Sequence, residues 1–275
     1  MKNVNIAFVG AGNMATSVIG GLIADGYRPD SISVADIDLP RTDALQKRFL
    51  IQRAESNQQA VAQADIVVLA VKPQVMHGVC AELAAAARTR RPLVISIAAG
   101  IRTSSIAQWI APDLAIVRAM PNTPALVGSG ATALFANEHA TAAQRAQAES
   151  LVRAVGCAVW LEREELMDVV TALSGSGPAY FFYLMEAMDQ VGRELGLPAD
   201  VSRLLTLQTA FGAAKMALES NIEIATLRRN VTSPGGTTER AIQTLETRQT
   251  SAAVADAVRA ATQRARELAD LFGST

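Results

Sequence analysis

The chain is poor in the residues that build metal sites, disulfide frameworks and basic binding surfaces. Its 275 residues include two histidines, two cysteines and 4% aromatic residues, and its formal net charge is −1. His77 and His139 lie far apart, and no cysteines or carboxylates cluster at metal-ligand spacing, so we expect no metal site. The near-neutral charge offers no broad field for nucleic acid, and two cysteines give no disulfide framework, so we expect a cytoplasmic protein that binds no nucleic acid.

Long uncharged runs are also scarce. The one stretch that could be taken for a signal peptide or a membrane span is residues 6–24, which holds no charge. It contains four glycines together with Asn13, Thr16 and Ser17, which make it too polar for a helix that crosses hydrocarbon. We therefore predict no membrane association.

The same stretch matches a dinucleotide-binding fingerprint. An apolar run, Val4 to Val9, leads into Gly-Ala-Gly-Asn-Met-Ala and then into a helical pattern. The first glycine permits a tight strand-to-helix turn, the second lets backbone amides approach a pyrophosphate, and the final alanine lets helix and strand pack closely. The pattern predicts a nucleotide site at Gly10, Ala11, Gly12, Asn13, Met14 and Ala15.

Strand and helix patterns alternate up to about residue 161, and strand patterns then stop. After the apolar run Val4 to Val9, which is the first predicted strand, further strands are predicted at Ser31–Asp36, Ile66–Val71, Leu93–Ala98, Leu114–Arg118, Ala131–Ala136 and Ala158–Leu161. Predicted helices in the second half are Pro178–Leu195, Ala199–Ser220, Thr238–Glu246 and Ser251–Phe272. We predict an α/β Rossmann-type domain with a doubly wound sheet over residues 1–162, followed by an all-α domain for substrate binding and dimerisation over residues 163–275.

The predicted C-terminal helices carry more apolar surface than about 110 residues can cover. One stripe comprises Tyr180, Phe181, Leu184, Met188 and Val191. Packing within one chain is the simpler alternative, but we favour an intertwined homodimer, which could assemble further.

Residues 231–238, Val-Thr-Ser-Pro-Gly-Gly-Thr-Thr, interrupt the helical half and are called the elbow below. Proline fixes one backbone angle, the glycines allow close approach of another molecule, and a helix start offers unpaired N–H groups. Such a turn suits a small carboxylate, although a plain helix-capping turn has the same composition. The candidate substrate-binding residues are Ser233, Gly235, Gly236, Thr237 and Thr238.

Polar residues that follow the parallel strands should line the cofactor crevice. Lys72, one of only four lysines, follows a buried strand and could reach a ribose or phosphate, or it could simply be solvated. Met120, between a strand and two prolines, resembles a wall of a nicotinamide pocket. Asp36 closes the second strand, where a carboxylate would bind the ribose hydroxyls of NAD and repel a 2′-phosphate. The Asp36 carboxylate therefore predicts a preference for NADH over NADPH, unless Asp36 only caps the next helix.

Six motifs in order resemble those of pyrroline-5-carboxylate reductases and span nearly the whole chain. They are Gly-Ala-Gly-Asn-Met-Ala, Ala-Val-Lys-Pro, Ser-Ile-Ala-Ala-Gly, Arg-Ala-Met-Pro-Asn-Thr-Pro, Ser-Gly-Ser-Gly-Pro-Ala-Tyr and Val-Thr-Ser-Pro-Gly-Gly-Thr-Thr. The resemblance implies reduction of the cyclic imine 1-pyrroline-5-carboxylate to L-proline with NAD(P)H. Two alternatives stay open: a 3-hydroxyacid or 6-phosphogluconate type of dehydrogenase, and a dinucleotide-binding protein without activity.

The resemblance also implies roles for single residues. The Thr238 hydroxyl would face the ring nitrogen as the catalytic group, while Ser233 and the amides near Gly236 would hold the substrate carboxylate. Besides the fingerprint residues, the cofactor would contact Asn57, Ala70, Val71, Lys72, Pro73, Ala98, Ala99, Gly100, Met120, Pro121 and Asn122.

Overall fold

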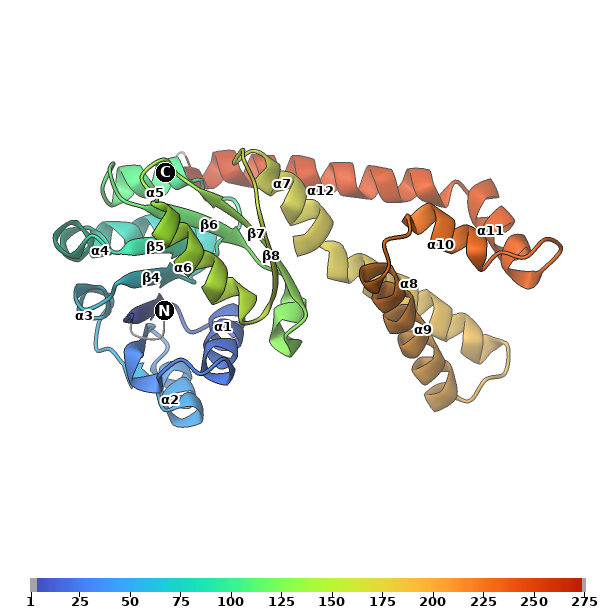
Figure 1. Ribbon diagram of the computed structural model, residues 1–275, viewed down its shortest axis with the longest axis horizontal. Coiled ribbons are helices and arrows are strands. Elements are labelled where there is room, and N and C mark those ends of the chain that lie inside the picture. The colour runs from blue at the N-terminus through green and yellow to red at the C-terminus, as the bar shows by residue number, and fades with distance from the viewer. Residues whose placement is uncertain (1–3, 274–275) are drawn as a thin grey trace. The chain divides into compact units, whose positions relative to one another are not determined.

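The computed structural model describes residues 4–273, which form two compact units (Figure 1). The first unit comprises the chain up to Ser176 together with the residues from Ala261 on, and the second comprises residues 177–260. This division differs from the predicted one after residue 162. Helix α7 (Leu166–Val170), the π-helical turn η4 (Thr171–Gly175) and the end of α12 (Thr250–Gly273) belong to the first unit. Buried apolar residues of these segments are Met167, Ala172, Ala265 and Ala269.

In the part of the chain that the structure describes, the first unit contains one sheet of eight strands in the order β3-β2-β1-β4-β5-β6-β7-β8. Figure 1 labels β4 to β8 of this sheet. All neighbouring strands are parallel except β6 and β7, which are antiparallel. The predicted doubly wound, mainly parallel sheet is therefore confirmed. The strands are β1 (Ile6–Val9), β2 (Ile32–Ala35), β3 (Gln52–Arg53), β4 (Ile66–Leu69), β5 (Leu93–Ser96), β6 (Ile116–Met120), β7 (Gly130–Ala136) and β8 (Gly156–Trp160).

Helices cover both faces of this sheet and bury its alternating side chains. One core joins the sheet to α1, α2 and α6, and the other joins it to α3, α4 and α5. Strand β4 is buried on both faces, as expected for a central parallel strand. The helices are α1 (Asn13–Ala24), α2 (Leu39–Phe49), α3 (Asn57–Ala62), α4 (Met76–Arg90), α5 (Thr103–Trp109) and α6 (Ala142–Arg153), with short 3₁₀ turns η1 (Pro29–Ser31), η2 (Pro73–Val75) and η3 (Thr123–Val127).

The register of the central strands brings the predicted cofactor loops to one edge of the sheet. Val9 pairs with Ala35 on one side and with Leu69 on the other. Gly10, Asp36 and Ala70 therefore leave their strands at the same level. The strand order changes direction at β1, which lies between β2 and β4, and this is where doubly wound sheets bind nucleotides.

The second unit is helical, as predicted. It contains α8 (Gly177–Glu194), α9 (Ala199–Glu219), α10 (Ile224–Asn230), α11 (Thr237–Thr247) and the beginning of α12. Helix α10 is too short to have been detected from its pattern. Helices α8 and α9 pack closely, since Ser202 Oγ donates a hydrogen bond of 2.8 Å to the Asp189 carbonyl oxygen. Many large apolar side chains of these two helices nevertheless stay exposed, among them Phe181, Leu184, Leu204 and Phe211.

Candidate active site

The fingerprint loop forms the tight turn that the glycines predicted. Gly10 has φ +107°, and a Cβ atom there would lie 2.6 Å from the Ala70 carbonyl oxygen. Its N–H donates to the Ala35 carbonyl oxygen at 2.8 Å. Gly12 is the N-cap of α1 and has no side-chain cap, and among the described residues no atom beyond its chain neighbours lies within 4 Å of a Cβ built on it. The start of α1 therefore offers free amides and open space, which fit a pyrophosphate.

Asp36 organises this loop through both carboxylate oxygens. Oδ2 accepts a hydrogen bond from the Ala11 N–H at 2.6 Å, and Oδ1 accepts one from the Asp38 N–H at 2.9 Å. Helix α2 is capped by Asp38, whose side chain also pairs with Arg41 at 2.9 Å. The alternative that Asp36 only caps the next helix is therefore wrong, because Asp38 occupies that position.

Three other predicted cofactor residues differ in their exposure and in the partners that they already have. Lys72 is exposed in the loop after β4, where it is the N-cap of η2. Asn57, the first residue of α3, donates from Nδ2 to Glu82 Oε2 at 3.1 Å, so its amide already has a partner. Gly100 is buried, and a Cβ on it would touch Ala269 of α12 at 3.5 Å. Lys72 is thus the most accessible of the three.

The segment after β6 contacts the π-helical turn. Asn122 donates from Nδ2 to the carbonyl oxygen and Oγ of Ser174 at 3.3 and 3.2 Å. Its Oδ1 accepts from the Ala131 N–H at 2.9 Å. A Cβ on Gly175 would lie only 2.6 Å from Met120 Cε, so the methionine methyl group packs against this glycine. The Asn122 side chain is therefore engaged within the protein, whereas Met120 stays partly exposed.

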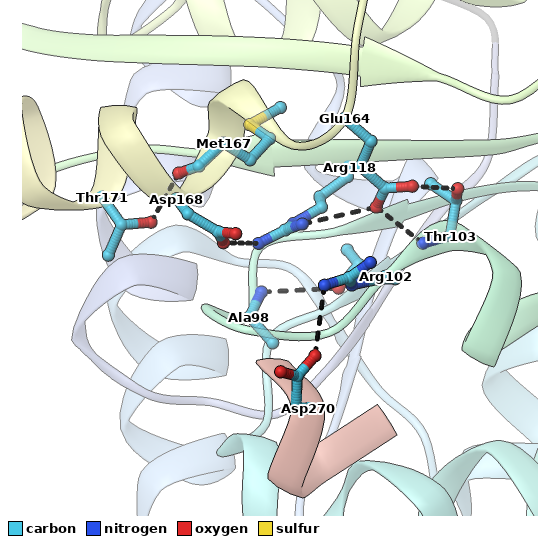
Figure 2. Close-up of polar contacts among 10 residues, drawn as sticks. Ala98, Arg102, Thr103, Arg118, Glu164, Met167, Asp168, Thr171 and Asp270 are labelled. Atoms are coloured by element: carbon cyan, nitrogen blue, oxygen red, sulfur yellow. Dashed lines mark hydrogen bonds and ion pairs between the residues drawn. The ribbon is translucent and has the colours of Figure 1, made fainter. Parts of the chain in front are cut away.

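Figure 2 shows a charged cluster around Arg118 of β6, which our sequence analysis did not find. Arg118 is 2% exposed, and its Nη1 lies 3.3 Å from Glu164 Oε1. Glu164 also accepts from the N–H and Oγ1 of Thr103 at 2.8 and 2.7 Å. Asp168 Oδ1 lies 3.9 Å from Arg118 Nη2. The sequence did contain a signal for this cluster. Arg118 lies inside an apolar strand, and Glu164 and Asp168 stand four residues apart after the last strand.

Burial governs the ionisation of this cluster. Desolvation lowers the pKa of Arg118, although the nearby carboxylates of Glu164 and Asp168 oppose the shift. Desolvation also raises the pKa of the Asp168 carboxyl, against the attraction of Arg118. Burial thus disfavours the charged form of each group, and the attraction between Arg118 and the carboxylates favours it.

The elbow lies in the second unit and immediately precedes α11. Gly236 is the N-cap and has no side-chain cap, while Gly235 has φ +71° and open space around it. The Gly235 N–H donates to Glu239 Oε2 at 2.8 Å, so a carboxylate of the first helical turn already satisfies one amide. Ser233 is exposed and Thr238 is half-buried. The elbow residues thus form one turn, whereas the predicted cofactor residues all belong to the first unit.

Within residues 4–273, no three histidine, cysteine, aspartate or glutamate side chains are grouped so that they could hold a metal ion. No helix in this part of the chain is both long and apolar enough to cross a membrane.

Comparisons with known proteins match both halves of the chain. Residues 164–268 match the family described as pyrroline-5-carboxylate reductase dimerisation, and residues 5–100 match the family described as NADP oxidoreductase coenzyme F420-dependent. A pyrroline-5-carboxylate reductase of Pseudomonas aeruginosa is 50% identical over 273 residues, which cover 99% of this chain and 100% of the relative.

Two solved structures are similar over their whole length. A pyrroline-5-carboxylate reductase from Coxiella burnetii has a TM-score of 0.92 and 46% identity, with 96% of this chain and 98% of that chain covered. A Plasmodium falciparum pyrroline carboxylate reductase with NADP bound has a TM-score of 0.88 and 27% identity, with 98% and 99% covered.

Proposed function

This chain belongs to the pyrroline-5-carboxylate reductase family, and on that premise we propose how its residues bind and align the reactants. The enzyme reduces 1-pyrroline-5-carboxylate to L-proline, the last step of proline synthesis, by hydride transfer from NAD(P)H. The other dehydrogenase types are not favoured, because relatives with this activity match the chain from end to end. Loss of NAD(P)H absorbance on addition of the imine tests the activity directly, and no imine-dependent loss would refute it.

The open start of α1 holds the cofactor pyrophosphate. Its support is the uncapped Gly12 beside the tight turn at Gly10, where free amides and a helix dipole favour an anion. Met120, partly exposed at the end of β6, forms an apolar wall for the nicotinamide ring. When bound, NAD(P)H supplies the hydride that reduces the imine carbon. The protein then has to hold the imine and this ring in contact, which by itself provides a large share of the acceleration.

Asp36 gives the enzyme a preference for NADH over NADPH. Its carboxylate is held in place by the N–H groups of Ala11 and Asp38, so it cannot easily turn away from a 2′-phosphate. Arg41 of α2 is a candidate to offset the charge of Asp36, but it pairs with Asp38. Like charges at the ribose cost binding energy for NADPH, whereas the ribose hydroxyls of NADH can donate to the carboxylate.

The variant Asp36→Asn tests this preference because it removes the charge and keeps an oxygen that can accept from Ala11. We expect kcat/KM for NADPH relative to NADH to rise about tenfold, equivalent to about 1.4 kcal/mol. Asp38→Asn is the matched control, since asparagine also caps helices well. A wild-type enzyme that prefers NADPH, or an unchanged ratio in Asp36→Asn, would refute the assignment.

The elbow binds the substrate. The N–H groups of Gly235 and Gly236 already have partners, so the first N–H groups of α11, at Thr237 and Thr238, receive the carboxylate together with the Ser233 hydroxyl. The Thr238 hydroxyl hydrogen-bonds the ring nitrogen. Thr238→Ala should lose about 1–3 kcal/mol of transition-state stabilisation and so lower kcat/KM for the imine, while cofactor affinity stays the same, because only a substrate contact is lost. Thr244→Ala is the control, since this threonine lies on the same helix and its hydroxyl donates to the Arg240 carbonyl oxygen. Equal kcat/KM in Thr238→Ala and wild type would rule out the contact.

The enzyme works as a homodimer in which each site combines the cofactor loops of one protomer with the elbow of its partner. The support is the apolar surface of α8 and α9, where Phe181 is 63% and Phe211 62% exposed. Refolding a Gly12→Val variant together with Thr238→Ala tests the arrangement. Random pairing should restore about a quarter of wild-type activity, because half of the dimers are mixed and each has one intact site. No recovery, despite mixed dimers, would refute shared sites.

A further inference from the structure

Alternate residues along β6 and the turn after it contact one segment, residues 164–176. Arg118 faces Glu164 and Asp168, Met120 packs on Gly175, and Asn122 bonds Ser174. The spacing of two is that of an extended chain, in which residues i, i+2 and i+4 share a face. Asn122 keeps an extended backbone, with φ −132° and ψ 167°, so the row continues past the strand. The row therefore holds this segment at its beginning and at its end.

Arg118 is the unusual member of the row. Its guanidinium is almost completely buried, and within residues 4–273 its Nε and Nη2 atoms have no hydrogen-bond partner. Such atoms are rare in folded proteins because burying them without partners is unfavourable. A well-packed apolar side chain would stabilise the fold at least as well as a buried ion pair. Stability alone thus does not account for an arginine at this position.

The segment that Arg118 holds lies directly behind the nicotinamide wall. After α7 the chain enters the π-helical turn η4, a rare conformation that is frequent at functional sites. The turn ends at Gly175, whose missing side chain leaves the space that Met120 Cε occupies. A displacement of this turn would therefore move the Met120 side chain.

We propose that Arg118 is a positioning residue for hydride transfer: through Glu164 and Asp168 it fixes α7 and η4, and these hold Met120 in one place beside the nicotinamide ring. The inference rests on the proposed placing of that ring at Met120. Arg118 itself touches neither reactant. It acts by keeping the wall behind the ring rigid, and an error of about 1 Å in such a wall can lower the rate a hundredfold.

The variant Asp168→Asn tests the proposal, since it keeps the side-chain shape and removes one charge that faces Arg118. We expect amide hydrogen exchange in residues 172–176 to become about tenfold faster and kcat to fall about tenfold. The isotope effect with cofactor deuterated at the transferred position should increase, because hydride transfer becomes slower than product release. Affinity for ADP-ribose, which lacks the nicotinamide, should stay within about twofold of wild type.

Glu149→Gln is the control, because Glu149 also bonds an arginine, Arg153 of helix α6, and its other partner, the indole N–H of Trp160, likewise lies outside residues 164–176. This variant should leave amide exchange in residues 172–176, kcat, the isotope effect and the affinity for ADP-ribose unchanged. If Asp168→Asn does not fold, Glu164→Gln replaces it with the same expectations. Unchanged exchange at residues 172–176, or faster exchange with normal kcat and a normal isotope effect, would overturn the proposal. A wild-type enzyme without imine reduction would refute the proposed function instead, and exchange would still report on the role of Arg118 in holding η4.

Discussion

Replacing the two glycines of the fingerprint by alanine should have different effects: Gly10→Ala should mainly lower stability, and Gly12→Ala should mainly lower cofactor affinity. At Gly10 the backbone has φ +107°, and a Cβ would lie 2.6 Å from the Ala70 carbonyl oxygen and 2.7 Å from its carbonyl carbon. Positive φ costs an L-residue about 1–2 kcal/mol. Overlap with backbone atoms that cannot rotate away adds about 1–3 kcal/mol. Gly10→Ala should therefore lower the free energy of unfolding of the first unit by about 2–5 kcal/mol.

Gly12→Ala is the matched comparison, because within residues 4–273 no atom beyond its chain neighbours lies within 4 Å of a Cβ there, and φ is −71°. We expect a stability loss of only about 0.5–1 kcal/mol, since alanine is a poorer N-cap than glycine. The new methyl group would instead occupy the space proposed for the pyrophosphate. Cofactor affinity should fall at least about tenfold, or about 1.4 kcal/mol.

Denaturant titration and calorimetric cofactor binding separate the two effects. Both tryptophans, Trp109 and Trp160, belong to the first unit, so fluorescence reports on its unfolding. The reasoning is refuted if Gly10→Ala is as stable as wild type. It is equally refuted if Gly12→Ala binds cofactor normally or unfolds as easily as Gly10→Ala.

Three further predictions concern the first unit. Burial raises the pKa of the Cys80 thiol to about 12, whereas Cys157 is exposed. A thiol reagent near pH 8 should therefore label only Cys157 until the protein unfolds. Rapid labelling of Cys80 in the native protein would contradict this. The pKa of Asp168 is raised in the folded protein, so the folded state binds this proton more tightly than the unfolded state does. As pH rises from the unfolded pKa through the folded pKa, this group therefore lowers the free energy of unfolding of the wild type. The stability of Asp168→Asn relative to wild type should therefore be higher near pH 7 than near pH 4, and the opposite trend in denaturant titrations would refute the sign. Asn137 bonds two backbone groups in and before β6, at 3.0 and 2.8 Å, so Asn137→Ala should cost about 1–3 kcal/mol in the same titrations, and a loss below about 0.5 kcal/mol would show that water replaces it.

Local chemistry explains why much of the fold could be predicted. Strands of period two, helices of period 3.6 and a glycine turn are properties of neighbouring residues, and the predicted helices in the second half end within about one residue of the observed ones. The fingerprint and the elbow were likewise recognisable, because both depend on consecutive residues. The two-residue strand β3 and the short helix α10 were missed, since neither is long enough to show a period.

The sequence by itself therefore determined the class of the longer strands and helices, the motifs that identify the family, and the candidate residues within each motif. Only the tertiary structure decided which segments far apart in the chain meet. It placed α7, η4 and the end of α12 with the sheet rather than with the other helices, and it engaged the Asn57 and Asn122 amides with protein partners. The cluster of Arg118, Glu164 and Asp168 arises because separate elements bury their charges in one place. Such pairing depends on packing between elements, which no local pattern encodes.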